Sequence, residues 1–334
     1  MGHDLATLAQ KLYDDAFVWD AHAGFEAWPT TDLTQLGLWK NAGVDFLSVN
    51  VGYDLQTLAD TIRALAYFRR WFDASEDFQV VTSVAQARGA RDAGKMAVAF
   101  DLEGMNPLAK SLDVLHLLHE LGVRQMLFAY NRNSDAGGGC HDDDRGLTQF
   151  GRDAVREMND LGILIDCSHC GYRTTMEAME LSRAPVIFSH SNPRGLHDHE
   201  RNIVDTQAVA CAVNGGVIGV NGISNFLGDA QCSSAAVADH VDYLLDLLGE
   251  AHVGIGLDYF FNDNTGAGGF NDVVTANAQY WPRDQYPGGP LRCAMPTQLL
   301  ELTEIMLQRG REERVVRGVL GENFARVAAE VWGG

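Results

Sequence analysis

Eight short apolar segments alternate along the chain with segments whose apolar residues repeat at helical spacing. The apolar segments span residues 17–22, 44–51, 96–104, 123–130, 162–169, 185–190, 216–221 and 252–259. Strands that are apolar along their whole length are buried on both faces, as parallel strands are when helices cover them. Eight such units predict an α/β fold, namely a (β/α)8 barrel of the TIM type. A doubly wound open sheet is the alternative.

We expect a single barrel domain over residues 1–334, because no repeat, low-complexity tract or linker divides the chain. Hydrophobic residues make up 46% of the sequence, which is enough for a large core. Two segments rich in glycine and asparagine, 131–146 and 260–296, follow predicted strands. They are expected to lie over the C-terminal rim of the barrel as binding or lid loops. The remainder of the chain is predicted to form three C-terminal helices.

The charge balance argues against two classes of partner. Lys and Arg total 25 against 45 Asp and Glu, which gives a formal net charge of −20. Such an acidic protein repels phosphate backbones and anionic lipid headgroups. We therefore expect a small-molecule substrate, with no nucleic acid and no membrane as partners.

A cytoplasmic location is expected from the start of the chain and from its cysteines. The N-terminal residues lack the basic and apolar blocks of a secretory signal, and six cysteines are too sparse for a disulfide framework. Cys167 and Cys170 have CxxC spacing, but no second such pair completes a zinc ribbon. We interpret them as structural residues at the end of a strand.

Polar residues that can bind a metal lie at the ends of five predicted strands. They are His22, Glu103, His169, His190 and Asp258. In a barrel the C-terminal ends of all strands meet on one face, so these side chains are expected to converge. Three imidazoles and two carboxylates are a donor set that suits zinc with an open position for water. The sequence therefore predicts a metal site at the C-terminal ends of the strands.

Several stretches of the sequence, in the same order along the chain, resemble the membrane (renal) dipeptidase family of the amidohydrolase superfamily. They are DAHAG (20–24), DLEG (101–104), GVRQMLFAYNRN (122–133), GLTQFGRDAVREMNDLGILIDCSH (146–169), APVIFSHSNPRGLHDHERNIVD (184–205), HVGIGLDYF (252–260) and GVLGENFARV (318–327). The resemblance covers nearly the whole chain. It implies a dimeric, zinc-dependent dipeptidase with two zinc ions bridged by a glutamate.

The resemblance also implies individual roles for residues of this chain. Glu103 matches the bridging carboxylate, and His169 and His190 match the ligands that complete the second metal site. His22 matches the histidine of the first metal site. Asp258 matches the aspartate that orients the bridging water and carries its proton.

The resemblance assigns one further residue to substrate binding. Arg201 matches the arginine that binds the terminal carboxylate of the substrate. An arginine fork suits that task because two of its donors can engage both carboxylate oxygens.

Gly24 departs from the family pattern at the first metal site. The family motif is DxHxD, in which the second aspartate is a ligand, whereas glycine has no side chain to offer. Glu26 could replace it if the loop bends, or a water could fill the gap. Otherwise the enzyme works with one metal on Glu103, His169 and His190. One or two zinc ions per chain are therefore expected, with the first site weakened.

Tyr130 is the second departure, because it stands where the family has a histidine that stabilises the developing oxyanion. A phenol can donate a hydrogen bond to an oxyanion as well. The alternative is that Tyr130 is an aromatic residue packed at the rim.

The function predicted from these residues is hydrolysis of a small amide by a metallo-dipeptidase, on dipeptides with a free C-terminal carboxylate, including a C-terminal D-residue. One alternative is an amidohydrolase of the same fold that cleaves a lactam, another non-peptide amide or an N-substituted amino acid. A second alternative is a metal-binding paralogue with weak or no catalysis.

Overall fold

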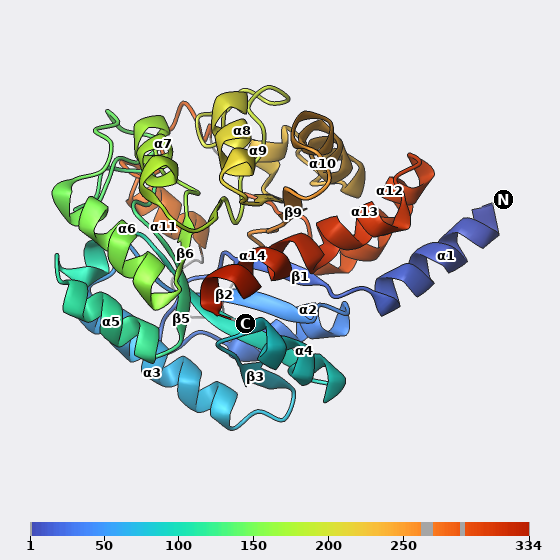
Figure 1. Ribbon diagram of the computed structural model, residues 1–334, viewed down its shortest axis with the longest axis horizontal. Coiled ribbons are helices and arrows are strands. Elements are labelled where there is room, and N and C mark those ends of the chain that lie inside the picture. Colours follow the sequence, from blue (N-terminus) through green and yellow to red (C-terminus); the bar gives the residue numbers. More distant parts are fainter. Residues whose placement is uncertain (1, 262–269, 288–290, 334) are drawn as a thin grey trace.

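Parallel strands form the centre of the computed structural model, which describes residues 2–261, 270–287 and 291–333 (Figure 1). Within these ranges the strands are β1 (Trp19–Ala23), β2 (Phe46–Tyr53), β3 (Phe78–Val80), β4 (Met96–Glu103), β5 (Val123–Leu127), β6 (Leu164–Asp166), β7 (Val186–Ile187), β8 (Ile218–Val220) and β9 (Val253–Ile255). A seven-stranded sheet has the order β1-β2-β4-β5-β6-β7, with β3 paired to β4, and a second sheet pairs β8 with β9. Every ladder is parallel.

The two sheets are linked at both ends of the strand series. A parallel bridge joins Phe188, just after β7, to Ile218 at the start of β8. At the other end, the Asp258 N–H donates to the His22 carbonyl at 3.2 Å, and the Gly24 N–H donates to the Tyr259 carbonyl at 3.1 Å. The α/β prediction is confirmed as a curled parallel sheet. Over the residues that the structure describes, the ladders form two sheets and not one closed eight-stranded barrel.

The predicted strands agree with eight of the nine observed ones among the described residues, and the sequence argument did not predict β3. The later strands are shorter than predicted. Segment 162–169 contains only Leu164–Asp166 as β6, and segment 185–190 contains only Val186–Ile187 as β7. The chain leaves the ladder where its polar residues turn towards the centre, so these residues lie on loops that directly follow the strands.

Helices cover the outer face of the strands (Figure 1). They are α1 (Gly2–Asp15), α2 (Gly37–Asn41), α3 (Leu58–Asp73), α4 (Val84–Asp92), α5 (Leu112–Glu120), α6 (Gln149–Leu161), α7 (Tyr172–Leu181), α8 (Asp205–Val213), α9 (Ser224–Leu227), α10 (Ser234–Leu248), α11 (Phe270–Ala276), α12 (Leu299–Gln308), α13 (Glu313–Arg317) and α14 (Asn323–Trp332). The last three confirm the predicted C-terminal helices. In the described part of the chain, no helix has the length and apolar character to cross a membrane.

The strand cores are buried on both faces, as their sequences predict. Every residue of β1, β2 and β4 is buried. The surrounding helices begin at side-chain caps: Thr57 forms a capping box with Asp60 at the start of α3, and the Thr148 side chain accepts the Gly151 N–H at the start of α6. This arrangement holds the C-terminal ends of the strands in fixed positions.

Asp20 in β1 ties the first strand to the segment after the last one. Its Oδ1 accepts the Leu257 N–H at 2.9 Å, and its Oδ2 accepts the Trp39 Nε1–H at 2.8 Å. The carboxyl group is fully buried, and burial raises its pKa to about 6. Asp20 therefore supplies the two acceptors that hold β1, Trp39 and the chain after β9 together.

We predict that Asp20→Ala destabilises the protein. Two buried donors would lose their acceptor, and each unsatisfied donor costs about 1–3 kcal/mol. The free energy of unfolding, measured by urea denaturation, should fall by at least that amount. The control is Asp92→Ala at the exposed end of α4, which should stay within about 0.5 kcal/mol of wild type. Equal stability of both variants would contradict this role of Asp20.

Candidate metal centre

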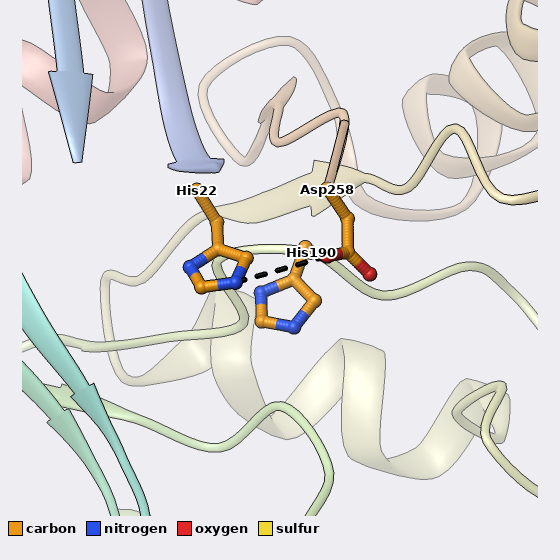
Figure 2. A group of neighbouring side chains, drawn as sticks. All are labelled: His22, His190 and Asp258. Carbon is orange, nitrogen blue, oxygen red and sulfur yellow. Dashed lines mark ion pairs between the residues drawn. The ribbon is translucent and has the colours of Figure 1, made fainter. Parts of the chain in front are cut away.

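The five polar residues predicted at strand ends lie together in the structure. His22 and Glu103 belong to β1 and β4, whereas His169, His190 and Asp258 each follow the last residue of β6, β7 and β9 by three positions. Figure 2 shows that His22, His190 and Asp258 point towards one another from separate segments. Their side chains are 0–14% exposed. The convergence expected from the strand order is present.

One carboxylate oxygen lies among three imidazole nitrogens. Glu103 Oε1 is 3.3 Å from His22 Nε2, 3.2 Å from His169 Nε2 and 3.5 Å from His190 Nε2. The Nε2 atoms of His169 and His190 are 2.9 Å apart. The other oxygen of Glu103 accepts a hydrogen bond from Asn50 Nδ2 at 3.0 Å. Glu103 is thus held from behind and presents Oε1 to all three rings.

The opposite nitrogen of each ring has a partner that fixes its orientation. His22 Nδ1 lies 3.2 Å from Asp101 Oδ2, and His169 Nδ1 lies 2.7 Å from Asn131 Oδ1. His190 Nδ1 lies 2.6 Å from the Ser189 hydroxyl, which in turn donates to Asp166. A proton on Nδ1 of His22 and of His190 leaves the Nε2 atom of each ring facing the centre, whereas His169 Nδ1 also accepts the Arg201 Nε–H at 3.1 Å. Metal-binding histidines in proteins are held in this way.

The electrostatics favour neutral His169 and His190 rings beside an ionised Glu103, whereas the pKa of His22 is raised. Burial, with Arg201 nearby, lowers the pKa of His169 to about 3, and burial also holds the pKa of His190 well below its usual range. Burial opposes ionisation of Glu103, but the adjacent imidazoles outweigh it and hold the pKa of Glu103 well below its usual range. Burial opposes charge on His22 too, yet carboxylates on both sides raise its pKa.

A divalent metal fits these residues. His22 Nε2 is buried and makes no hydrogen bond. Two groups have ligand atoms that lie within 4.8 Å of one another: His22, His190 and Asp258, and Glu103, His169 and His190. Without a cation, several lone pairs would face one another in a buried space, which is costly. Imidazole nitrogen and carboxylate oxygen are ligands that borderline divalent metals accept.

Glu26 does not take the place of the missing side chain at Gly24. Its Oε1 accepts the Tyr53 hydroxyl at 2.6 Å, and its Oε2 accepts the Trp28 Nε1–H at 3.3 Å. Both oxygens are therefore engaged at the wall of the pocket. The bent-loop alternative for Glu26 is not what the structure shows.

The metal centre forms the floor of a pocket of about 540 Å³, including the open space at its mouth. It is lined by Gly24, Phe25, Glu26, Asn50, Tyr53, Glu103, Tyr130, His169, Ile223, Phe226, Asp258, Phe260, Trp281, Tyr286 and Leu291. The lining combines polar groups with aromatic and aliphatic side chains. Trp281, Tyr286 and Leu291 come from the long segment after β9, as the loop prediction expects, whereas residues 262–269 and 288–290 of that segment lie outside the described chain.

Tyr130 lies in this pocket against the metal centre. Its ring stacks on the His169 ring with centroids 4.1 Å apart and is edge-on to Trp281 at 5.7 Å. Its backbone N–H donates to Asp54 Oδ2 at 2.8 Å. Burial raises the pKa of Tyr130 well above its usual range, so the phenol stays protonated. Tyr130 is therefore a packed residue of the pocket that keeps its hydroxyl proton.

Arg201 lies behind His169, in a position more enclosed than expected for a substrate-binding group. Its Nε is 3.1 Å from His169 Nδ1, its Nη1 donates to the Ser191 hydroxyl at 3.0 Å, and its Nη2 donates to the His190 carbonyl at 3.0 Å. The residue is 2% exposed and lines a neighbouring cavity of about 650 Å³, open space at its mouth included, rather than the central pocket. Each Nη nitrogen still carries a second N–H.

Asp54 is a buried residue of the site that the sequence argument missed. Its Oδ1 accepts the Asn106 N–H at 2.9 Å and its Oδ2 accepts the Tyr130 N–H, so it joins the loops after β4 and β5. Burial raises its pKa to about 7. A usable signal was present, because Asn50, Asp54 and Asp101 are polar residues in or beside apolar strands.

Cys167 and Cys170 lie beside the centre without contributing ligands to it. Both thiols are free and buried, and burial raises their pKa values. Cys170 Sγ contacts the Ala129 carbonyl at 3.6 Å. Neither belongs to a candidate metal group among the described residues. This agrees with their interpretation as structural residues.

Known sequences share this arrangement of segments. The membrane dipeptidase family, peptidase family M19, matches residues 14–278. Dipeptidase 3 of Mus musculus is 34% identical over 276 residues, which are 79% of this chain and 50% of that protein. An uncharacterized dipeptidase of Schizosaccharomyces pombe is 35% identical over 212 residues, or 60% of this chain and 50% of that protein. The chain spans about half the length of these curated relatives.

Solved structures share the fold. An amidohydrolase from Pseudomonas aeruginosa has a TM-score of 0.88 and 27% identity, with 98% of this chain and 99% of that chain covered. A metallo peptidase from Rhodobacter sphaeroides, liganded with a phosphinate mimic of the dipeptide L-Ala-D-Ala, has a TM-score of 0.75. It is 24% identical over 95% of this chain and 100% of its own, a similarity of fold. The family match spans all nine described strands and all five convergent residues, so this chain belongs to the membrane dipeptidase family, peptidase family M19.

Proposed function

We propose that the protein is a zinc-dependent dipeptidase that hydrolyses dipeptides with a free C-terminal carboxylate. The observation that carries this proposal is Glu103 Oε1, which lies 3.2–3.5 Å from three imidazole nitrogens on the floor of a pocket. Membership of the membrane dipeptidase family supports it. Glu103, His169, His190 and His22 would hold one or two zinc ions.

Zinc bound there would lower the pKa of a bound water towards about 7 and polarise the scissile carbonyl. Asp258 would accept a proton from the attacking water and pass it to the leaving amine. Burial raises the pKa of Asp258 to about 6, so it is a stronger base than an exposed aspartate and is mostly ionised at neutral pH. Asn221 Nδ2 donates to Asp258 Oδ2 at 2.9 Å and fixes its orientation.

Arg201 would bind the substrate carboxylate with the N–H groups that its protein contacts leave available. The Ser191 hydroxyl and the His190 carbonyl use one hydrogen from each Nη nitrogen. The second hydrogens remain for an anion, and the fixed guanidinium would lose little entropy on binding. A free C-terminal acid close to the metal centre limits substrates to short ones.

Tyr130 would donate its hydroxyl to the oxyanion that forms on the scissile carbonyl. A neutral phenol with a raised pKa keeps its proton across the working pH range. The apolar lining residues Phe226, Trp281 and Leu291 would hold an apolar side chain of the substrate.

A second candidate is an amidohydrolase that acts on a lactam, another non-peptide amide or an N-substituted amino acid. Gly24 and Tyr130 favour it, because both differ from the family pattern within the catalytic pocket. A metal-binding paralogue without turnover is the third candidate. A homodimer and a cytoplasmic location stay predictions.

The first prediction concerns substrates. Purified protein supplied with zinc should hydrolyse members of a panel of L-L and L-D dipeptides, with apolar side chains preferred, and a chelator should abolish the activity. Amidated dipeptides are the matched control, because they lack the carboxylate for Arg201. An inert dipeptide panel alongside turnover of a lactam or an N-acyl amino acid would select the second candidate. Bound zinc without turnover of any amide would select the third.

A second prediction concerns His190. His190→Ala removes a buried nitrogen ligand, so zinc affinity and kcat/KM should each fall by on the order of 10²-fold or more, since even outer-shell changes cost about 10–100-fold. Metal analysis and dipeptide assays measure this. The control is His116→Ala, a half-exposed histidine on α5 paired with Glu157, which should change neither. Full turnover by zinc-free His190→Ala would rule out the metal mechanism.

A third prediction separates catalysis from packing at Tyr130. Tyr130→Phe keeps the ring that stacks on His169 but removes the hydroxyl. We expect kcat to fall on the order of 10²-fold with little change in KM, because the hydroxyl acts in the transition state. The thermal midpoint should stay near that of wild type. An unchanged kcat would mean that Tyr130 is a packing residue only.

A further inference from the structure

Glu26 places a carboxylate in the wall of the central pocket, in the segment that directly follows β1. The residue is half-buried, and its Oε1 and Oε2 accept hydrogen bonds from the Tyr53 hydroxyl and the Trp28 Nε1–H. Burial, with Glu26 beside it, raises the pKa of Tyr53, so the phenol keeps its proton and acts as the donor. Two donors stabilise a charged carboxylate at this place in the pocket.

Tyr53 connects this carboxylate to the metal centre. Its ring is edge-on to the Tyr130 ring with centroids 5.4 Å apart, and the Tyr130 ring stacks on His169. In the ladder between β2 and β4, Tyr53 is also the register partner of Glu103. Tyr53 therefore lies between Glu26 and the residues that would hold the metal. A small substrate whose carbonyl lies at the centre can extend along the same pocket towards Glu26.

The lining of the pocket is acidic. Among the described residues that line it, three are carboxylates, namely Glu26, Glu103 and Asp258, and none is a lysine or an arginine. Glu103 Oε1 and Asp258 Oδ1 lie beside His22 Nε2, at 3.3 Å and 3.7 Å, so their charges face the metal centre. Glu26 is bound instead by Tyr53 and Trp28. A negative charge at this wall favours a ligand that carries a positive charge there.

We infer that Glu26 binds the α-ammonium group of the substrate and so selects dipeptides with a free N-terminus. The inference rests on the dipeptidase function proposed above. Glu26 follows β1, the first strand in the order of the seven-stranded sheet, whereas Arg201 lies in the segment after β7, the last one. A dipeptide carries opposite charges on the two sides of its scissile bond. Arg201 would bind the carboxylate and Glu26 the ammonium.

This assignment separates dipeptides from the N-substituted amino acids of the second candidate function. An N-acyl amino acid keeps the amide and the terminal carboxylate but has no ammonium group, so it would forgo the ion pair with Glu26. Specificity is a difference between two affinities, and this ion pair contributes to only one of them. If Glu26 served only to hold Tyr53, its loss would weaken ligands with and without the amine equally.

The test measures binding by calorimetry on the zinc-loaded whole chain, independently of turnover. The probes are a phosphinate mimic of L-Ala-D-Ala and the same molecule without its amino group. Wild type should bind the amino ligand more tightly. Glu26→Gln should reduce the ratio of the two dissociation constants at least about 10-fold, because a hydrogen bond to a charged group contributes at least that factor. Tyr53→Phe is the matched control, since it removes the hydroxyl that Glu26 accepts and keeps the carboxylate, and its ratio should stay near that of wild type.

Several results would overturn the inference. They are a wild type that binds neither ligand or shows no preference for the amino ligand, a Glu26→Gln variant that keeps the wild-type ratio, and a Tyr53→Phe variant that loses as much of the ratio as Glu26→Gln does. Should Glu26→Gln fail to fold, a crystal structure of wild type with the amino phosphinate decides. An ammonium nitrogen at about 2.7–3.2 Å from a Glu26 oxygen supports the assignment, and one bound elsewhere overturns it.

The two proposals fail separately. Dipeptides that are not hydrolysed, together with the expected change of the binding ratio in Glu26→Gln, refute only the function. Hydrolysis of dipeptides by wild type, together with an unchanged binding ratio in Glu26→Gln, refutes only the role of Glu26.

Discussion

The contact between Glu103 and three imidazoles is the constraint on which the rest of the site depends. One carboxylate oxygen lies 3.2–3.5 Å from three ring nitrogens in a buried space. The adjacent imidazoles hold the pKa of Glu103 well below its usual range, so the carboxylate is ionised. Imidazole nitrogen and carboxylate oxygen are ligands that a divalent metal accepts, so these residues would hold such an ion. The fold can maintain the arrangement because each group is held from its outer side.

The outer contacts link the centre to the scaffold. Asp101, Asn131 and Ser189 hold the three rings, and Asn50 holds Glu103. Buried carboxylates then join the segments that carry these residues, since Asp20 connects β1 to the chain after β9 and Asp54 connects the loops after β4 and β5. Small displacements of any one segment would therefore move a ligand. This explains why so many buried polar residues surround the ends of the strands.

Much of the fold and of the metal centre could be predicted from the sequence, because both depend on patterns within short segments of the chain. His22 and Glu103 end apolar segments that form β1 and β4, so their place on the rim followed from strand order. The structure has no room for a side chain at position 24, because its Cβ atom would collide with Asp258. This could not be predicted, because it depends on the packing of residues distant in the chain. Arg201, which is predicted to bind the substrate carboxylate, packs behind His169, where its Nη nitrogens donate to the Ser191 hydroxyl and the His190 carbonyl.

X-ray absorption at the zinc edge of the zinc-loaded protein tests the central claim most directly, because it identifies the ligand atoms. The account predicts nitrogen and oxygen ligands at about 2.0–2.2 Å with the scattering pattern of imidazole. Cys167 and Cys170 flank His169 in the sequence and are the competing ligands. A sulfur shell at about 2.3 Å, or no retained zinc, would contradict a centre built from Glu103 and three histidines.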